Sequence, residues 1–346
     1  MKNLAPALRR SPLLQVLILV FLTPGLILMP LQVGANPLDP NVIAGNVNFQ
    51  GLGTAALDIN NASQMAVINW QSFSIDAGEI TRINQGANAF TLNRVVSGNP
   101  SAIYGQLRAS NGGVAVINPN GIVVGAGGVV DVAGMMVMST LDIDNDDFLN
   151  GGENRFYGNS TTGVSNFGTI SSASGDVVLL GGFVKNEGQI GALNGTVAIG
   201  SGGDIILHEG GGARISVRGS SDYTGTGIDN TGTVQGAAAE MKAHGNVYAL
   251  AINNGGAIRA TGADRSNGRV RLMASGGSSN INLGQTSAIA ATAGVDGGSI
   301  EVNAGQGAVA VGGSMAATGA REGGTISVVG STVTQAPNAV VDASGA

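Results

Sequence analysis

No cysteine occurs among the 346 residues, which excludes disulfides, thiol nucleophiles and cysteine-ligated metal centres. Aromatic residues make up only 4% of the chain, too few for a core packed from large side chains. Charged residues make up only 11%, yet 43% of the residues are hydrophobic, and a disordered chain would lack such apolar content. The 58 glycines disfavour long helices and favour tightly stacked β structure with many close turns. We therefore predict an all-β fold.

Motifs of catalysis are equally scarce. His208 and His244 are the two histidines, and each stands alone in a glycine-rich context that is typical of surface residues. The sequence has no GxxxxGK[ST] phosphate loop and no GxSxG nucleophile turn. We expect neither a cofactor nor an enzymatic activity.

The N-terminal segment predicts export by the general secretory route. Basic residues precede an apolar stretch at residues 13–31, and small residues typical of a cleavage site follow it. This pattern predicts a signal peptide of residues 1–35 that is cleaved between Ala35 and Asn36. A membrane anchor is the alternative, but Pro24 and Gly25 interrupt the apolar stretch. No later stretch is long and apolar enough to span a membrane, so we expect no stable membrane insertion.

The charge of the mature chain limits its partners. Removal of residues 1–35 takes away three basic residues and no acidic ones, which leaves 13 basic against 22 acidic residues and a formal charge of −9. This charge disfavours binding to nucleic acid and to anionic membrane surfaces.

Repeats occur in the C-terminal third of the chain. The segments IRATGA, IAATAG, MAATGA and VDASGA begin at residues 258, 289, 315 and 341, at intervals of 31, 26 and 26 residues. Between them, Val270 and Leu272 alternate with Arg269 and Arg271, a strand pattern with one buried face. Short strands that recur with glycine-rich turns predict the coils of a β-solenoid.

The segment INPNGI interrupts an apolar run with a turn. Asn118, Pro119 and Gly121 suit positions 1, 2 and 4 of a type I turn. Val114 and Val116 before it, and Ile122 after it, read as inward-facing strand residues. The segment therefore predicts a corner between two core-facing strands.

Four blocks in succession carry a family resemblance: INWQSFSIDAGEITRINQG from residue 68, LNRVVSGNPSAIYGQL from 92, INPNGIVVGAGGVVDVAGMMVMSTLDI from 117 and GTISSASGDVVLLGGFVKNEGQI from 168. Together they resemble the N-terminal secretion (haemagglutination activity) domain of filamentous haemagglutinin-like exoproteins, the passengers of two-partner secretion. The resemblance implies a right-handed parallel β-helix with small extra-helical hairpins or loops. It also implies export by a dedicated outer-membrane transporter, whose periplasmic domains recognise the passenger. We expect a secretion domain over residues 36–250 and solenoid repeats of about 26 residues over 251–346.

The same resemblance assigns secretion motifs. An NPNGI-type motif is needed for secretion in the family, and it maps onto Asn118, Pro119, Asn120, Gly121 and Ile122. An earlier NPNL motif has its equivalent at Asn99 and Pro100, although Ser101 and Ala102 follow here. The alternative for both motifs is a purely structural role, as corners that folding needs and that the transporter never contacts.

An acidic run, DIDNDDFLNGGE, begins at Asp142. Asp142, Asp144 and Asp146 match positions 1, 3 and 5 of a calcium-binding loop, with Glu153 at position 12. Position 6 is Asp147, where such a loop needs glycine, so a solvated loop that projects from the solenoid is the default interpretation.

The two ends of the predicted solenoid differ. Residues 36–50, with Val42, Val47 and Phe49, are expected to cap the first coil, and Trp70 and Phe73 to form a buried aromatic anchor beneath it, rather than a sugar-stacking platform. VDASGA at the other end stops in mid-repeat with no polar cap, which predicts either an open last coil or a chain shorter than most exoproteins of the family.

We predict a secreted or cell-surface adhesin-like exoprotein of a Gram-negative-type envelope. Its partners would be the outer-membrane transporter and a host-cell, glycan or matrix receptor. Two alternatives stay open. One is a carbohydrate-active β-helix enzyme, which would need clustered carboxylates, or a basic residue, on one exposed solenoid face. The other is a structural matrix protein without a receptor.

Overall fold

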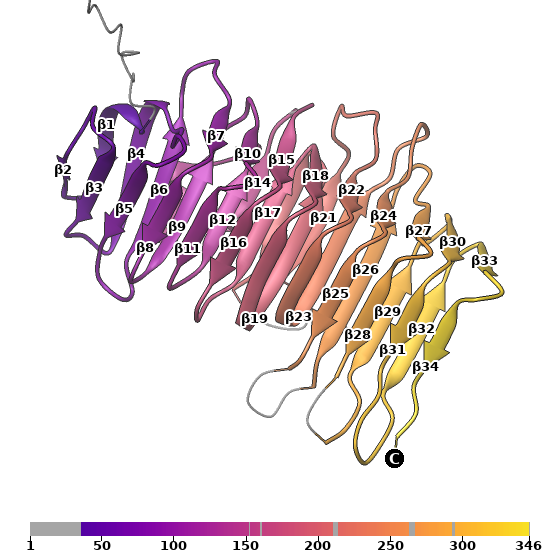
Figure 1. The fold of residues 1–346 in the computed structure, drawn as a ribbon. Coiled ribbons are helices and arrows are strands. Elements are labelled where there is room, and N and C mark those ends of the chain that lie inside the picture. The colour runs from indigo at the N-terminus through magenta and orange to yellow at the C-terminus, as the bar shows by residue number, and fades with distance from the viewer. Residues whose placement is uncertain are drawn as a thin grey trace, which may run out of the picture. The chain divides into compact units, whose positions relative to one another are not determined.

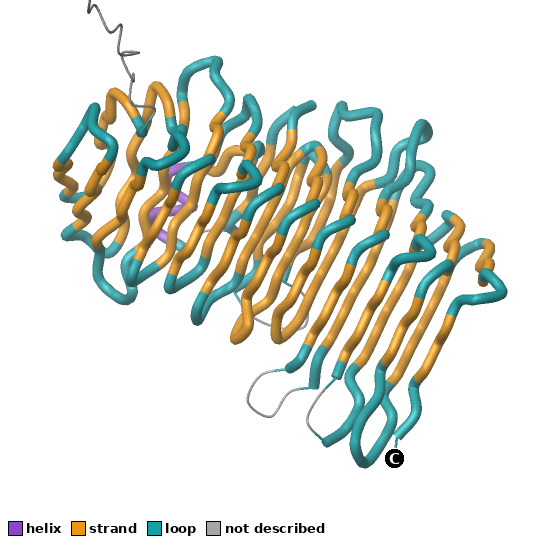
Figure 2. Tube along the Cα trace, viewed as in Figure 1, coloured by secondary structure: helices purple, strands orange, loops and turns teal. Residues whose placement is uncertain are grey.

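The computed structural model describes residues 36–151, 153–159, 161–209, 214–262, 267–292 and 295–345. They belong to one compact unit, Gly34–Ala346, which is a parallel β-helix of three faces (Figure 1). The segments that link the strands are mostly short, so each coil continues directly into the next (Figure 2). Within the described ranges, no helix has the length and apolar content to cross a membrane.

Each face is a row of parallel strands. Face 1 consists of β7 (Ser101–Ile103), β10 (Ile122–Val124), β15 (Gly163–Asn166), β18 (Phe183–Asn186), β22 (Ile228–Asn230), β24 (Ile252–Asn254), β27 (Ile281–Leu283), β30 (Ala308–Val311) and β33 (Thr332–Gln335). Face 2 consists of β3 (Ala56–Asn61), β5 (Ile80–Asn84), β8 (Gln106–Ala109), β11 (Val129–Val132), β16 (Thr169–Ser172), β25 (Ala257–Ala260), β28 (Ala288–Ala291), β31 (Ser314–Ala316) and β34 (Val340–Asp342). Face 3 consists of β4 (Met65–Ser72), β6 (Phe90–Val95), β9 (Gly113–Ile117), β12 (Met136–Ser139), β17 (Val177–Gly181), β26 (Arg269–Ser275), β29 (Ser299–Asn303) and β32 (Thr325–Val329).

Two long strands belong to both face 2 and face 3. These are β19 (Gln189–Ser201) and β23 (Thr233–His244). β19 pairs with β16 in its first half and with β17 in its second, and its register with β23 shifts between Ala192 and Thr196. At this irregularity the chain turns from face 2 to face 3, where other coils have a loop.

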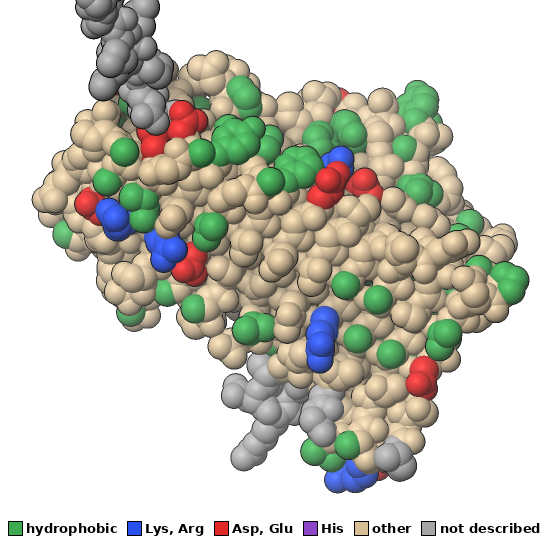
Figure 3. Space-filling view, viewed as in Figure 1, with side chains coloured by type: hydrophobic (Ala, Val, Ile, Leu, Met, Phe, Trp, Pro, Cys, Tyr) green, Lys and Arg blue, Asp and Glu red, His purple; other side chains and the backbone are tan. Residues whose placement is uncertain are grey.

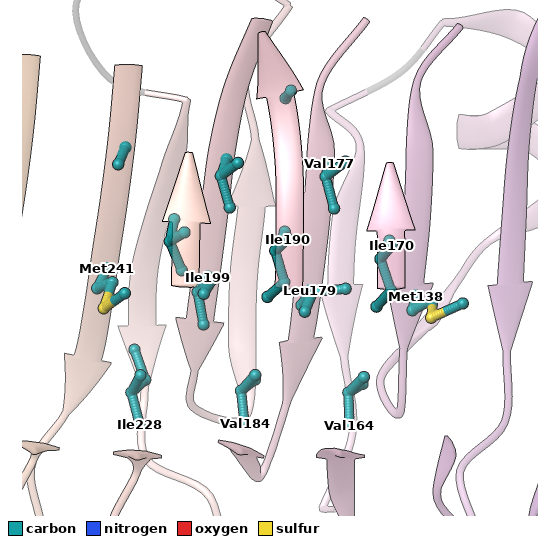
Figure 4. Close-up of a cluster of buried hydrophobic side chains, with 14 of the residues drawn as sticks. Met138, Val164, Ile170, Val177, Leu179, Val184, Ile190, Ile199, Ile228 and Met241 are labelled. Carbon is teal, nitrogen blue, oxygen red and sulfur yellow. The ribbon is translucent and has the colours of Figure 1, made fainter. Parts of the chain in front are cut away.

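The interior is filled by aliphatic side chains stacked in register. Val164, Val184 and Ile228 are partners on successive strands of face 1, and the rows of buried side chains are visible in Figure 4. The C-terminal repeats stack in the same way, because Ile258, Ile289, Met315 and Val341 are register partners along face 2. Burying each apolar side chain fully contributes roughly 1.5–3 kcal/mol.

Among the described residues, five elements leave the β-helix. They are β13 (Asp142–Ile143), α2 (Asn145–Asn150), β14 (Arg155–Tyr157), β20 (Asp204–Leu207) and β21 (Ile215–Gly219). The four strands form a separate sheet in the order β13-β14-β20-β21, and we call these five elements the excursion. The excursion covers the outer side of face 3, where its Phe156 and Ile205 pack with Ala115, Val137 and Val178 in a second hydrophobic cluster. The extra-helical elements expected from the resemblance are thereby confirmed, and one of them is a helix.

This cover explains a pattern in the sequence. The strands of face 3 beneath the excursion, β9 and β17, are buried at every residue. Strands buried on both sides read as continuous apolar runs, whereas β26, farther along the face, alternates buried and half-buried residues.

The predicted N-terminal cap is present. β1 (Leu38–Ala44) pairs antiparallel with β4, and β2 (Val47–Gln50) pairs antiparallel with β3, which covers the open ladder of the first coil. At the other end, Val340 and Val341 of the last described coil are exposed. The domain boundary predicted between residues 250 and 251 lies where β22 pairs with β24 in a continuous stack, and it stays a prediction.

Candidate functional site

Asn118 lies at the corner between β9 on face 3 and β10 on face 1, and its side chain is fully buried. Its Nδ2 donates to the carbonyl oxygen of Asn99 and to Oγ of Ser101, both at 2.9 Å. Its Oδ1 accepts from the backbone N–H of Asn120 at 2.9 Å and from Nδ2 of Asn120 at 3.0 Å. Asn118 therefore ties its own turn to the preceding coil.

The rest of the INPNGI segment completes the corner. The Gly121 N–H donates to the Asn118 carbonyl at 3.1 Å, so the predicted β-turn is present. Gly121 has φ +112°, a left-handed conformation that residues with a Cβ rarely adopt. Asn120 Nδ2 also donates to the carbonyl of Ser97 at 2.7 Å. Ile122 is buried, as predicted for a core-facing residue.

The structure brings the two predicted motifs together. Asn99 and Pro100 lie one coil before Asn118 and Pro119, and the Ser101 N–H donates to the Gly121 carbonyl at 2.9 Å. Asn99, Pro100 and Pro119 are exposed. Pro100, Pro119 and Asn120 line one surface hollow of about 570 Å³, which we call the proline hollow.

The excursion forms the opposite wall of the proline hollow through Asp142 and Tyr157. Arg94 of β6 holds this wall in place, because its side chain is only 11% exposed and all three guanidinium nitrogens are bonded. Nε donates to Asp142 Oδ1 (2.8 Å), Nη1 to Asn145 Oδ1 (2.7 Å) and Nη2 to the carbonyl of Ile143 (2.6 Å).

The three carboxylates of the calcium candidate do not converge. Asp142 is paired with Arg94, and Asp144 accepts a hydrogen bond from the Tyr157 hydroxyl at 3.1 Å. Asp146 lies in the first turn of α2, where a calcium loop would still be extended. In the part of the chain that the structure describes, no three His, Asp or Glu side chains are grouped to hold a metal ion. The helix replaces the predicted solvated loop because Phe148 is buried against the solenoid.

A pair on the excursion has a predictable pH response. Hydrogen bonds from Arg155, with Nε 2.9 Å from Asp204 Oδ1, lower the pKa of Asp204. A carboxylate whose pKa is lower in the folded state stabilises that state above its unfolded pKa of about 3.9, and this contribution is lost as the pH falls through the folded pKa. In Arg155→Met we expect the pKa of Asp204, measured from its carboxyl carbon shift by NMR, to rise toward the unfolded value. Arg108→Met is the control, since Arg108 pairs with Asp131 instead, and an unmoved pKa in Arg155→Met would contradict the assignment.

The other predicted residues are distributed over the solenoid. Trp70 and Phe73 are fully buried, and Trp70 contacts Phe49 and Phe73 edge to face, which confirms the aromatic anchor. Asn36 is fully buried, with Nδ2 2.6 Å from the carbonyl of Thr54, while Ala35 lies outside the described residues. His208 and His244 are half-buried at the surface, with His208 Nε2 2.8 Å from Ser216 Oγ and His244 Nδ1 3.1 Å from the carbonyl oxygen of Gly245.

Sequence reasoning missed a ladder of buried asparagines at the corner between faces 1 and 2. Asn166, Asn186, Asn230 and Asn254 hydrogen-bond in sequence, each Nδ2 donating to the next Oδ1 at 2.8, 2.7 and 2.6 Å. An asparagine one or two residues before a glycine recurs in the segments SNFG, KNEG, DNTG and NNGG, and this signal could have identified the ladder.

Comparison with known proteins gives two curated matches to Haemophilus influenzae proteins, each described as a heme/hemopexin-binding protein. One is 31% identical over 250 residues, which is 69% of this chain and 27% of that protein. The other is 33% identical over 109 residues, or 31% of this chain and 12% of that protein. The chain thus spans about a quarter or less of the length of these relatives.

Two solved structures share the fold. The HMW1 secretion domain from Haemophilus influenzae superposes with a TM-score of 0.69 at 23% identity, over 90% of this chain and 84% of that one. The filamentous hemagglutinin secretion domain has a TM-score of 0.52 at 15% identity, over 90% of this chain and all of that one. The TPS secretion domain family matches residues 39–277, which is more than half of the chain. The chain therefore belongs to the TPS secretion domain family, the domain of two-partner secretion passengers.

Proposed function

We propose that an outer-membrane transporter exports the chain and contacts the proline hollow at Pro100 and Pro119, together with the exposed Asn99 that precedes Pro100, while Asn118 stabilises the fold of the corner. The observation that carries this proposal is the difference in exposure between neighbouring residues of one motif. Asn118 is fully buried and bonded to its own chain, so the folded corner cannot offer it to a partner. Pro100 and Pro119 are exposed side by side on one surface.

The route to the outer membrane is part of the proposal. A signal peptide of residues 1–35 would direct the chain through the general secretory route, with cleavage between Ala35 and Asn36. The burial of Asn36 supports this position, since its Oδ1 accepts from Thr81 Oγ1 at 2.9 Å and its side chain thus anchors the start of the cap.

Outside the cell we propose an adhesin-like role through a host-cell, glycan or matrix receptor, without catalysis. Charged side chains are sparse on the face seen in Figure 3. The densest acidic run of the sequence is engaged in holding the excursion, through Asp142 with Arg94 and Asp144 with Tyr157. This use of the carboxylates favours a binding protein over a carbohydrate-active enzyme.

The test is secretion of a Pro100→Glu/Pro119→Glu variant from cells with and without the transporter. Pro337→Glu is a matched control, since Pro337 is an exposed proline before β34, far along the chain from the hollow. We expect the double variant to melt at the wild-type temperature when purified, yet to reach the medium at least about tenfold less, because a charge in an interface must be desolvated. The control should be secreted normally. Normal secretion of the folded double variant would refute recognition at the proline hollow.

A further inference from the structure

The second hydrophobic cluster is incompletely filled. Between the outer side of face 3 and the excursion lies a cavity of about 480 Å³. Met65, Phe90 and Ala115 form its solenoid wall, and Phe148, Leu149 and Phe156 form its excursion wall. The cavity is partly open to solvent, so a small molecule can enter it from outside, as in other ligand pockets.

The size and lining of the cavity match those of ligand sites. Small-molecule pockets are typically about 300–1,000 Å³, mostly apolar, and carry a few placed polar groups. The cavity is lined largely by aliphatic, aromatic and methionine side chains. Its charged lining residues are Arg214 and Glu209, and Glu209 is exposed and accepts a hydrogen bond from Asn154.

Arg214 is the basic residue among those that line this cavity. Its side chain is only 13% exposed, and its Nε lies 2.5 Å from Asp176 Oδ2. Its Nη1 donates to the carbonyl of His208, while Nη2 donates to the Met135 sulfur at 3.8 Å. A thioether sulfur is a weak hydrogen-bond acceptor. A carboxylate in its place would form a stronger hydrogen bond with this edge of the guanidinium.

A network of paired charges lies behind Arg214. Glu240 is fully buried, and Lys242, Arg269 and Arg271 lie 3.4, 4.0 and 3.9 Å from its carboxylate, while Arg271 also lies 3.2 Å from Glu301. These charges compensate one another, so the edge of Arg214 that meets the Met135 sulfur is the part of the network without a carboxylate partner. We propose that the cavity binds a long-chain fatty acid, with the acyl chain between face 3 and α2 and the carboxylate on Arg214.

The test is fluorescence titration of the purified mature chain with cis-parinaric acid and with its methyl ester. We expect saturable binding of one acid per chain, with the ester at least about tenfold weaker because it lacks the charge. Arg214→Gln should remove the preference for the acid, and Arg214→Lys should keep part of it. Leu149→Trp, which fills the cavity from its rim on α2, should weaken acid and ester alike by at least about tenfold.

Leu193→Trp provides the matched control, since Leu193 is 57% exposed and does not line the cavity. It should bind the acid as the wild type does, and circular dichroism should show that every variant is folded. Absence of saturable binding, equal binding of acid and ester by the wild type, or unchanged binding by folded Leu149→Trp would each overturn the proposal. If Arg214→Gln does not fold, the acid preference of Arg214→Lys and the loss in Leu149→Trp decide it.

Discussion

Replacing Asn118 by alanine should lower the free energy of unfolding by about 2–4 kcal/mol, because it leaves buried polar groups without partners at about 1–3 kcal/mol each. Ser101 is fully buried and would lose the donor to its hydroxyl, and the Asn120 N–H would lose its acceptor. Urea unfolding followed by the fluorescence of Trp70, the one tryptophan in the sequence, measures this change. Secretion of the variant should fall with its stability.

Asn99→Ala is the control for Asn118→Ala. Asn99 is exposed, and it takes part in the corner through its backbone carbonyl, which alanine keeps. Its free energy of unfolding should stay within about 0.5 kcal/mol of the wild type. If Asn118→Ala were as stable as Asn99→Ala but were not secreted, Asn118 would be read by the transporter directly, and our division of roles within the motif would be wrong.

Replacing Trp70 by alanine should lower the free energy of unfolding by about 3–5 kcal/mol, the cost of removing a large buried aromatic side chain. Trp70 packs against Phe49 of the cap at a centroid distance of 5.4 Å and against Phe73 at 5.7 Å. The loss should therefore release the cap and expose the strand ladder of the first coil, which favours aggregation. Circular dichroism in urea gives the stability, and hydrogen exchange of β1 and β2 amides reports release of the cap.

Two variants separate the anchor from a general effect of losing an aromatic ring. Trp70→Phe keeps most of the packing but removes the hydrogen bond from Nε1 to Asn93 Oδ1 (3.1 Å), and we expect a smaller loss of about 1–3 kcal/mol. Tyr104→Ala removes a ring that is 48% exposed and should change stability by less than about 1 kcal/mol. If amide hydrogen exchange in Trp70→Ala became faster throughout the chain, and not mainly in β1 and β2, Trp70 would not be a specific anchor of the cap.

Local pattern was sufficient for the solenoid itself. Val270 and Leu272 alternate with polar residues and are buried side by side in β26, since a strand presents successive side chains to opposite faces. The turn at Asn118–Gly121 was also predictable, because its residue types suit their turn positions without help from distant contacts. The cap and the aromatic anchor were predictable as well, because the exposed strand ladder of the first coil needs a cover.

Contacts between distant segments decided the candidate site. Strands β13 and β14 join β20 and β21 in one sheet over face 3, and no local pattern specifies that pairing. Local pattern also does not predict the hydrogen bonds of Arg94, whose partners lie about fifty positions later in the chain. Nor does it predict that Pro100 and Pro119 line one hollow. The coil, its corners and the family follow from short-range periodicity and motif, which can be read along the chain. The burial of individual motif residues, the cover that the excursion provides and the position of the cavity follow from packing between segments far apart in the chain, which local pattern does not specify.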